Sequence, residues 1–190
     1  MWVDYIAIDK RLRETLSERR YRHVLGCVDE AVRLARRWGA DEAKARAAAL
    51  LHDMTKELAP QAQLKMCAEF GIMPNNAEIS SPGLLHGASS AVIARRDYGQ
   101  PEDICLAIKY HTTGRADMSL LEKVLFVADF IEPTRTFDHS EMTELAYSDL
   151  DQAVFYGLCW VIKEVVDKKA ILHKDTIEGY NFLLGDKGER

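Results

Sequence analysis

Hydrophobic residues recur along this chain at intervals of three and four positions, the period of an amphipathic α-helix, whereas strand-like alternation is scarce. The stretch SERRYRHVLGCVDEAVRLARRWGA shows the pattern clearly, because Val24, Val28 and Ala35 fall on one helix face. Ser17 is a suitable N-cap for this helix, and Gly39 is a suitable stop. The pattern therefore predicts one long helix between these two residues.

The same reasoning predicts further helices. Asp41 can cap a helix that runs to about His52, and Ser119 with Glu122 forms a capping box before the apolar run LLEKVLFVADFI. Other helices are expected over about residues 60–70, 82–98, 101–111 and 176–184, and a long one over residues 150–169 opened by Ser148 with Asp151. Together these elements predict an all-α fold, a bundle of roughly eight helices.

Composition narrows the range of partners. The net charge of −5 argues against a general nucleic-acid binder, because affinity for the phosphate backbone comes from clustered Lys and Arg. No apolar run approaches the ~18 residues of a membrane span, and the N-terminus lacks the features of a secretory signal. We therefore expect a cytoplasmic protein that binds neither nucleic acid nor membrane, and in which any anionic ligand meets a local basic site.

The cysteines give no sign of a zinc knuckle or a disulfide framework. They are far apart and form no C-x-x-C pair. We expect all of them to be small buried hydrophobic residues in a reducing compartment. They are Cys27, Cys67, Cys105 and Cys159.

Ionisable residues stand at the ends of several apolar stripes. His52 ends a stripe of alanines that begins at Ala45, and Asp53 lies about 100° further round the helix, given ~3.6 residues per turn. His111 ends a similar stripe that begins at Ile104. A single core histidine is more often structural than functional. A neighbouring histidine and aspartate, however, can hold one ion between them.

Asp129 lies in LLEKVLFVADFI, which is hydrophobic nearly all round. An unpaired carboxylate there would cost several kcal/mol, so it needs a cationic partner. Lys123, Arg135, a helix-cap hydrogen bond or a metal ion could each serve. Glu132 and Pro133 follow at once, so we expect the helix to end near Asp129 and to leave this carboxylate at the helix mouth.

Considered as a set, these residues are more specific than any one of them. They supply imidazole and carboxylate groups, without thiolates, from four or five predicted helices, and such ligands suit iron, manganese or zinc. The set consists of His23, His52, Asp53, His86, His111 and Asp129.

The order His23, His52-Asp53, Asp129 is the H…HD…D signature of the HD-domain metal-dependent phosphohydrolases, an all-α superfamily. The blocks RYRHVLGCVDEAVRLA, LLHDMTK, LLHG, YHTTG, LEKVLFVADFIEPTR and DTIEGYNFLL together closely resemble the YqeK family of bacterial HD proteins. This likeness implies one HD domain over residues 1–190, with its core over about residues 17–184.

The resemblance implies a hydrolase that splits diadenosine tetraphosphate symmetrically into two ADP, by attack of a metal-bound hydroxide on phosphorus. It implies one or two divalent ions, preferably iron, with manganese or zinc as alternatives. The metal ligands would be His23, His52, Asp53 and Asp129. Metal-bound water has its pKa lowered towards ~7, which provides the nucleophile.

The resemblance also implies contacts to the nucleotide. Lys56 and Arg135 match phosphate-contacting positions, while His86 and His111 would either lie beside the diphosphate or complete a second metal site. Lys56, His86 and His111 would act in catalysis by stabilising charge on the phosphates. Further nucleotide contacts are implied near the C-terminus, at His173, Thr176, Tyr180 and Asn181.

The sequence leaves the base specificity open, and it leaves two alternative functions. Tyr180, Phe130 or Phe137 could pack on adenine, although each is by default a core residue, and no motif distinguishes adenine from guanine. A homodimer is compatible with the sequence. Another HD-type nucleotide phosphohydrolase, such as a nucleotidase or an alarmone hydrolase, would use the same metal ligands. A non-catalytic nucleotide-binding regulatory protein is the other alternative, but such proteins usually lose the HD pair or the final Asp, which are intact here.

Overall fold

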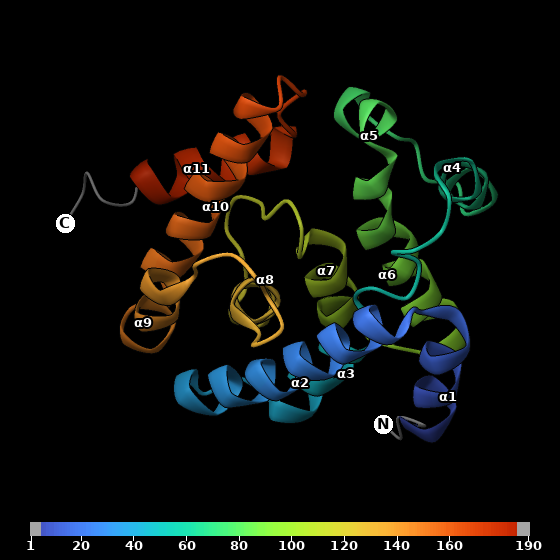
Figure 1. Ribbon diagram of the computed structural model, residues 1–190, viewed down its shortest axis with the longest axis horizontal. Coiled ribbons are helices and arrows are strands. Elements are labelled where there is room, and N and C mark those ends of the chain that lie inside the picture. Colours follow the sequence, from blue (N-terminus) through green and yellow to red (C-terminus); the bar gives the residue numbers. More distant parts are fainter. Residues whose placement is uncertain (1–4, 186–190) are drawn as a thin grey trace.

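A computed structural model describes residues 5–185, and this range is built of α-helices joined by turns, without a β-strand (Figure 1). The all-α prediction is confirmed. The elements in chain order are α1 (Tyr5–Thr15), α2 (Glu18–Trp38), α3 (Glu42–Leu51), α4 (Pro60–Glu69), α5 (Asn76–Ser80), the 3₁₀ turn η1 (Pro82–Leu84), α6 (Leu85–Tyr98), α7 (Glu102–Tyr110), α8 (Leu120–Ile131), α9 (Ser140–Ser148), α10 (Leu150–Asp167) and α11 (Lys174–Gly185).

The predicted N-cap and stop of α2 and the predicted capping box of α8 are confirmed. The Ser17 side chain accepts a hydrogen bond from the backbone N–H of Arg20, and Gly39 ends α2 in the left-handed region with φ 78°. That conformation favours glycine because it has no Cβ. Ser119 and Glu122 form the expected capping box at the start of α8. Local sequence chemistry therefore fixes where α2 and α8, which carry His23 and Asp129, begin.

Several details differ from the prediction. The helices α1, α5 and α9 were not expected, and α5 is too short, at 5 residues, to show a helical period. The N-cap of α10 is Asp149, whose side chain accepts from the N–H of Gln152, because Ser148 still belongs to α9. The helix α8 continues past Asp129 to Ile131, so this aspartate lies in the last turn rather than at the helix end.

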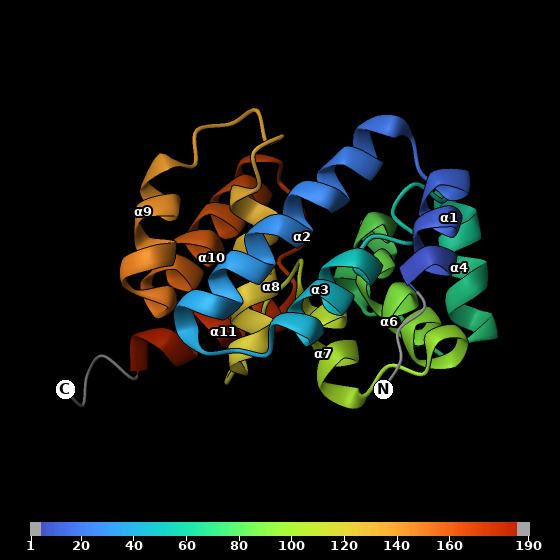
Figure 2. The same cartoon turned by 90° about the horizontal axis from the view of Figure 1, so that it is seen from below.

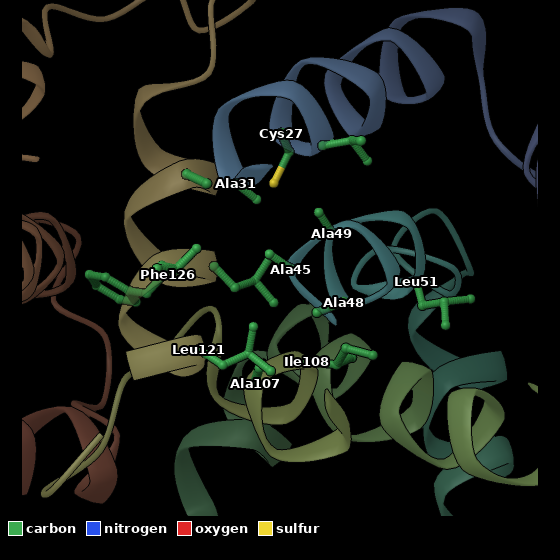
Figure 3. Close-up of a cluster of buried hydrophobic side chains, with 14 of the residues drawn as sticks. Cys27, Ala31, Ala45, Ala48, Ala49, Leu51, Ala107, Ile108, Leu121 and Phe126 are labelled. Atoms are coloured by element: carbon green, nitrogen blue, oxygen red, sulfur yellow. The ribbon is translucent and has the colours of Figure 1, made fainter. Parts of the chain in front are cut away.

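Small side chains let the central helices approach closely. The helix α2 packs against both α3 and α8; in Figure 2 it passes in front of α8 and α3 lies beside it. Ala45, Ala48 and Ala49 of α3 are fully buried, and Figure 3 shows Ala49 on the side of α3 that faces Cys27 of α2. Alanine keeps high helix propensity while leaving little bulk between helices. The C-terminal end of α3 is thereby held against its neighbours.

The remaining helices surround this centre. The helix α7 packs against α3, α6 and α8, while α10 lies along the far side of α8 and contacts α9 and α11 (Figure 1). Three of the four cysteines are buried as predicted, but Cys159 on α10 is partly exposed, which corrects the expectation for that residue. Within residues 5–185, no helix is both long enough and apolar enough to cross a membrane.

Candidate metal centre

The residues singled out as candidate metal ligands lie together, although they come from five helices. His23 lies within α2, His52 and Asp53 follow α3, His86 is in the first turn of α6, His111 follows α7, and Asp129 is in the last turn of α8. The side chains of His52 and His86 are completely buried. The convergence follows from the packing of α2, α3, α7 and α8 around one centre.

Three of the histidines are oriented in the same way. Each forms a hydrogen bond through Nδ1 with the backbone carbonyl three residues earlier, at 2.6 Å for His52, 2.5 Å for His86 and 2.6 Å for His111. A carbonyl oxygen can only accept, so Nδ1 carries the proton. In the neutral ring, Nε2 then presents its lone pair to the centre of the cluster, which is the form that binds metal.

His23 is oriented by a buried carboxylate instead. Its Nδ1 lies 2.9 Å from Oε1 of Glu132, whose side chain is fully buried. Glu132 also accepts from the N–H of Thr134 at 2.8 Å and from its hydroxyl at 2.6 Å. A Cβ at Gly26 would lie 2.5 Å from Oε2 of Glu132. The glycine therefore makes room for the carboxylate that holds His23.

Asp53 lies between two pairs of histidines. Its Oδ2 is 3.5 Å from Nε2 of His23 and 3.4 Å from Nε2 of His52. Its Oδ1 is 3.1 Å from Nε2 of His86 and 3.8 Å from Nε2 of His111. One oxygen thus faces each pair, an arrangement that could bridge two ions.

Asp129 lies beside the pair formed by His23 and His52. Its Oδ1 is 3.0 Å from Nε2 of His23 and 3.8 Å from Nε2 of His52, and Nη2 of Arg135 donates to the same oxygen at 2.5 Å. Burial would raise the pKa of Asp129, but Arg135 and His23 outweigh it and hold that pKa well below its ordinary value. The carboxylate is therefore ionised, as a metal ligand must be.

Unpartnered polar atoms show that the cluster fits a cation. Among residues 5–185, Nε2 of His23, Nε2 of His52 and Oδ1 of Asp53 are buried without a hydrogen-bond partner. Such atoms normally cost free energy, which a bound ion would remove. The donor atoms of His23, His52 and Asp129 lie within 4.8 Å of one another, and so do those of His52, Asp53 and His111. Their all-N/O chemistry suits a divalent transition metal.

His86 and His111 face each other within the second pair. Their Nε2 atoms are 3.0 Å apart, and burial lowers the pKa of both rings, so both are neutral. Each Nε2 then carries a lone pair. The hydroxyl of Thr112 lies 3.1 Å from Nε2 of His111 and 3.4 Å from Nε2 of His86, but it can donate to only one of them.

Basic side chains border the cluster. Nζ of Lys56 lies 3.5 Å from Nε2 of His86, and Arg135 contacts Asp129 as described. Sequence reasoning missed Arg20, whose Nη1 donates to Oδ2 of Asp53 at 2.8 Å. Its position three residues before His23 on the same helix is the pattern that could have revealed it.

The four side chains predicted to contact the nucleotide near the C-terminus lie outside the group of candidate metal ligands. His173 contacts Asn75 at 2.8 Å through Nε2, and the hydroxyl of Thr176 donates to the carbonyl of Thr113 at 2.8 Å. The Tyr180 ring stacks on Phe155 with centroids 5.4 Å apart, and Asn181 is exposed. The structure does not bring these four side chains into the metal-ligand cluster, our name for the group His23, His52, Asp53, His86, His111 and Asp129.

The sequence profile of the HD domain matches residues 20–134, a span that contains every side chain of the metal-ligand cluster. The chain belongs to the HD-domain family. The HD-domain membership predicted from the order His23, His52-Asp53, Asp129 is thereby confirmed, and the protein is an HD-superfamily hydrolase.

Relatives of this HD protein resemble it over nearly its whole length. It is 39% identical to the symmetrical bis(5′-nucleosyl)-tetraphosphatase of Bacillus subtilis, over 91% of this chain and 94% of the relative. It is 36% identical to the protein of the same name from Halalkalibacterium halodurans, over 89% of this chain and 91% of that relative. A crystal structure from Clostridium acetobutylicum, called a "predicted HD superfamily hydrolase involved in NAD metabolism", is 40% identical and superposes with a TM-score of 0.93 over 98% of this chain and 99% of that one.

Proposed function

We propose that this protein hydrolyses diadenosine tetraphosphate symmetrically to two ADP, with a divalent metal ion held by His23, His52, Asp53 and Asp129. The main support is the set of buried donor atoms without hydrogen-bond partners, which lie beside three basic side chains. The names of the relatives in Bacillus subtilis and Halalkalibacterium halodurans support the choice of reaction.

A divalent ion held by His23, His52, Asp53 and Asp129 would supply the chemistry that the side chains lack, namely activation of a water molecule and neutralisation of negative charge on phosphate. The protein side chains bind and orient the substrate. Arg135 offers a planar fork that matches phosphate oxygens, and Lys56 offers a compact charge at the edge of the cluster. Arg20, which borders the same cavity, adds a third cation. Together they place a diphosphate beside the metal ligands.

His86 and His111 are proposed to hold a second ion together with Oδ1 of Asp53. The two Nε2 atoms support this choice, because they lie 3.0 Å apart and 3.1 and 3.8 Å from Oδ1 of Asp53, and imidazole with carboxylate is a ligand set that suits a divalent metal. Without a second ion, the same two rings would contact the substrate phosphates. Iron as the preferred metal, a cytoplasmic location and a homodimer remain predictions.

The proposal is tested by product analysis with metal analysis on the same sample. Protein purified without oxygen or chelator should contain one or two divalent ions per chain and convert diadenosine tetraphosphate to ADP alone. Asp53→Ala should lose metal and activity together, since Asp53 faces both histidine pairs. A metal-free Asp53→Ala protein with full activity would contradict the metal site, and AMP with ATP as main products would contradict symmetric cleavage.

A further inference from the structure

The segment that contains Asp53 and Lys56 is not part of a helix. The helix α3 ends at Leu51, and residues 52–57 form a run of turns before α4 begins at Pro60. Within this run the backbone N–H of Lys56 donates to the carbonyl of Asp53 at 3.0 Å. Short-range bonds of this kind shape a turn but do not fix it against its neighbours. Contacts from other elements must therefore set where the Asp53 carboxylate lies.

A buried threonine ties this turn to α6. The hydroxyl of Thr55 donates to the carbonyl of His86 at 3.2 Å, and only 2% of the residue is exposed. Oγ1 of Thr55 also lies 2.7 Å from Oγ of Ser89 and 3.1 Å from Oγ of Ser90. The backbone N–H of Thr55 donates to the same Oγ of Ser90 at 3.3 Å. Thr55 is thus bonded to α6 through both its side chain and its backbone.

The helix α4 contributes one more side chain to these contacts. Nε2 of Gln63 donates to the carbonyl of Thr55 at 2.5 Å, and its Oε1 accepts from the hydroxyl of Ser89 at 3.2 Å. We call Thr55, Gln63, Ser89 and Ser90 the Thr55 network. Within residues 5–185, none of its side-chain polar atoms is buried without a hydrogen-bond partner. A buried network that is fully satisfied is rigid, because displacing one member leaves a polar group unpaired.

The first turn of α6, which contains His86, packs directly on α7. A Cβ at Gly87 would lie 2.6 Å from the carbonyl oxygen of Lys109, so the two helices approach as closely as glycine allows. His111 follows two residues after Lys109, and its Nε2 lies 3.0 Å from Nε2 of His86. The start of α6 is therefore fixed against α7, and the Thr55 network fixes the turn after α3 against α6.

We infer that Thr55 is a positioning residue of the metal site, whose hydroxyl sets the place of Asp53 relative to His86. Thr55 lies two residues after Asp53 and is bonded to the carbonyl of His86, and Oδ1 of Asp53 is 3.1 Å from Nε2 of His86. This inference rests on the proposed function, which assigns a second ion to His86, His111 and Oδ1 of Asp53. Thr55 contacts no metal itself and acts through these ligands.

The Thr55 network acts on one side of the metal-ligand cluster. Its hydrogen bonds join α4, α6 and the turn after α3, whereas His23 and Asp129, which face the first ion, lie on α2 and α8. Loss of the Thr55 hydroxyl should therefore weaken the second ion more than the first. A residue that only stabilises the fold would not distinguish between the two ions.

Manganese titration of the chelator-treated protein, followed through the EPR signal of the free ion, tests this role. Wild type should bind two ions, and His111→Ala identifies the affinity of the second ion because it removes a ligand of that ion alone. Thr55→Val keeps the shape of the side chain without the hydroxyl. It should weaken the second ion by about 10- to 100-fold, the usual effect of losing an outer partner of a metal ligand, and should change the first by a few-fold at most. Thr55→Ser keeps the hydroxyl and should bind both ions within a few-fold of wild type.

The matched control is Tyr147→Phe, which removes a hydroxyl that donates to the buried Glu30 between α9 and α2. It should lower the melting temperature and leave both manganese affinities unchanged. Ser90→Ala removes the acceptor of the Thr55 N–H, and it serves as the second variant if Thr55→Val does not fold. It should also weaken the second ion selectively.

Three results would overturn the positioning role. The first is a wild type that binds a single ion. The second is a Thr55→Val protein, or a Ser90→Ala protein in its place, in which both affinities are unchanged or fall equally. The third is a loss in Thr55→Ser as large as the loss in Thr55→Val.

The positioning role and the proposed reaction fail in different ways. Selective weakening of the second ion in Thr55→Val, in a protein that does not hydrolyse diadenosine tetraphosphate, would support the positioning role and contradict the reaction. Hydrolysis to ADP, with a Thr55→Val variant that binds both ions as wild type does, would support the reaction and overturn the positioning role.

Discussion

Glu132 holds the imidazole of His23 across a separation of 109 positions in the chain, through a bond of 2.9 Å between Oε1 and Nδ1. A carboxylate oxygen accepts, so Nδ1 carries a proton, and in the neutral ring the lone pair of Nε2 is directed toward Asp53 and Asp129. Partners of this kind raise the basicity of a ligating histidine and fix its orientation. The metal centre therefore depends on a residue that binds no metal itself.

Glu132→Gln should weaken metal binding by about 10- to 100-fold, the usual effect of removing such a partner. The amide keeps one acceptor but loses the charge, and its NH₂ group cannot accept from Thr134. Metal affinity is measured by competition with a chelating dye. The matched control is Glu30→Gln, which changes another buried glutamate of α2, one that accepts from the hydroxyl of Tyr147 on α9. Equal metal affinity in the two variants would contradict the role of Glu132.

Gly26→Ala should destabilise the protein, although alanine normally favours a helix interior by about 1 kcal/mol over glycine. The reason is the 2.5 Å approach that its Cβ would make to Oε2 of Glu132. Displacing Glu132 should also weaken metal binding. Urea unfolding of a double-mutant cycle with Glu132→Ala checks the cause, since the alanine at position 26 should be neutral or stabilising once the carboxylate is gone. A penalty that persists in the double mutant would point to another cause.

Lys56→Ala should reduce turnover at least tenfold while metal content stays the same, because Lys56 lies beside the cluster and its proposed role is to supply charge to phosphate. The measurement pairs steady-state kinetics with metal analysis of the purified variant. Lys65→Ala serves as the control, since that lysine lies on the exposed face of α4 and pairs with Glu69. Full activity in Lys56→Ala, or loss of metal from it, would contradict the assigned division of roles.

Glu57 should make stability depend on pH. It accepts from the N–H of Ser17 at 2.6 Å and from its hydroxyl at 2.7 Å, and so joins the turn after Asp53 to the start of α2. Partial burial raises the pKa of Glu57, but the bonds from Ser17 outweigh it and bring that pKa below its ordinary value. The ionised group therefore stabilises the fold above the unfolded pKa of about 4.3, and this contribution is lost as pH falls through the lower folded pKa.

The test compares wild type with Glu57→Gln in urea at several pH values. Wild type should be the more stable protein near neutral pH, and the difference in the free energy of unfolding should shrink below about pH 4. A difference that stays constant over this range would show that ionisation of Glu57 contributes nothing.

Much of the fold and of the metal cluster could be predicted because the evidence for both is local. Ser17, Gly39 and Ser119 act on their own helix ends, and His52 and His111 end apolar stripes that point to the core. The partners that orient these ligands are tertiary. Glu132, in a polar segment that follows a helix, has the local appearance of a surface carboxylate, and its burial follows only from the packing of α8 against α2.

The same limit applies to the residues that line the cavity beside the candidate metal ligands. Trp160 lies in an apolar run of α10, and its place in the wall of the cavity that Asp129 also lines depends on the packing of α10 on α8. The C-terminal candidates, such as Thr176 and Tyr180, were implied by resemblance, and their side chains contact Thr113 and Phe155 here. Sequence blocks indicate membership of a family, whereas three-dimensional packing determines which side chains border a cavity.

Hydrolysis of diadenosine tetraphosphate in water enriched in heavy oxygen tests the central claim most directly. In the proposed reaction Lys56 and Arg135 hold the diphosphate and water attacks one of the two middle phosphorus atoms of the tetraphosphate chain, so both products would be ADP. Mass spectrometry should find ADP alone, with one heavy oxygen in the terminal phosphate of half of the molecules and none in the other half. AMP and ATP as the main products would contradict the account.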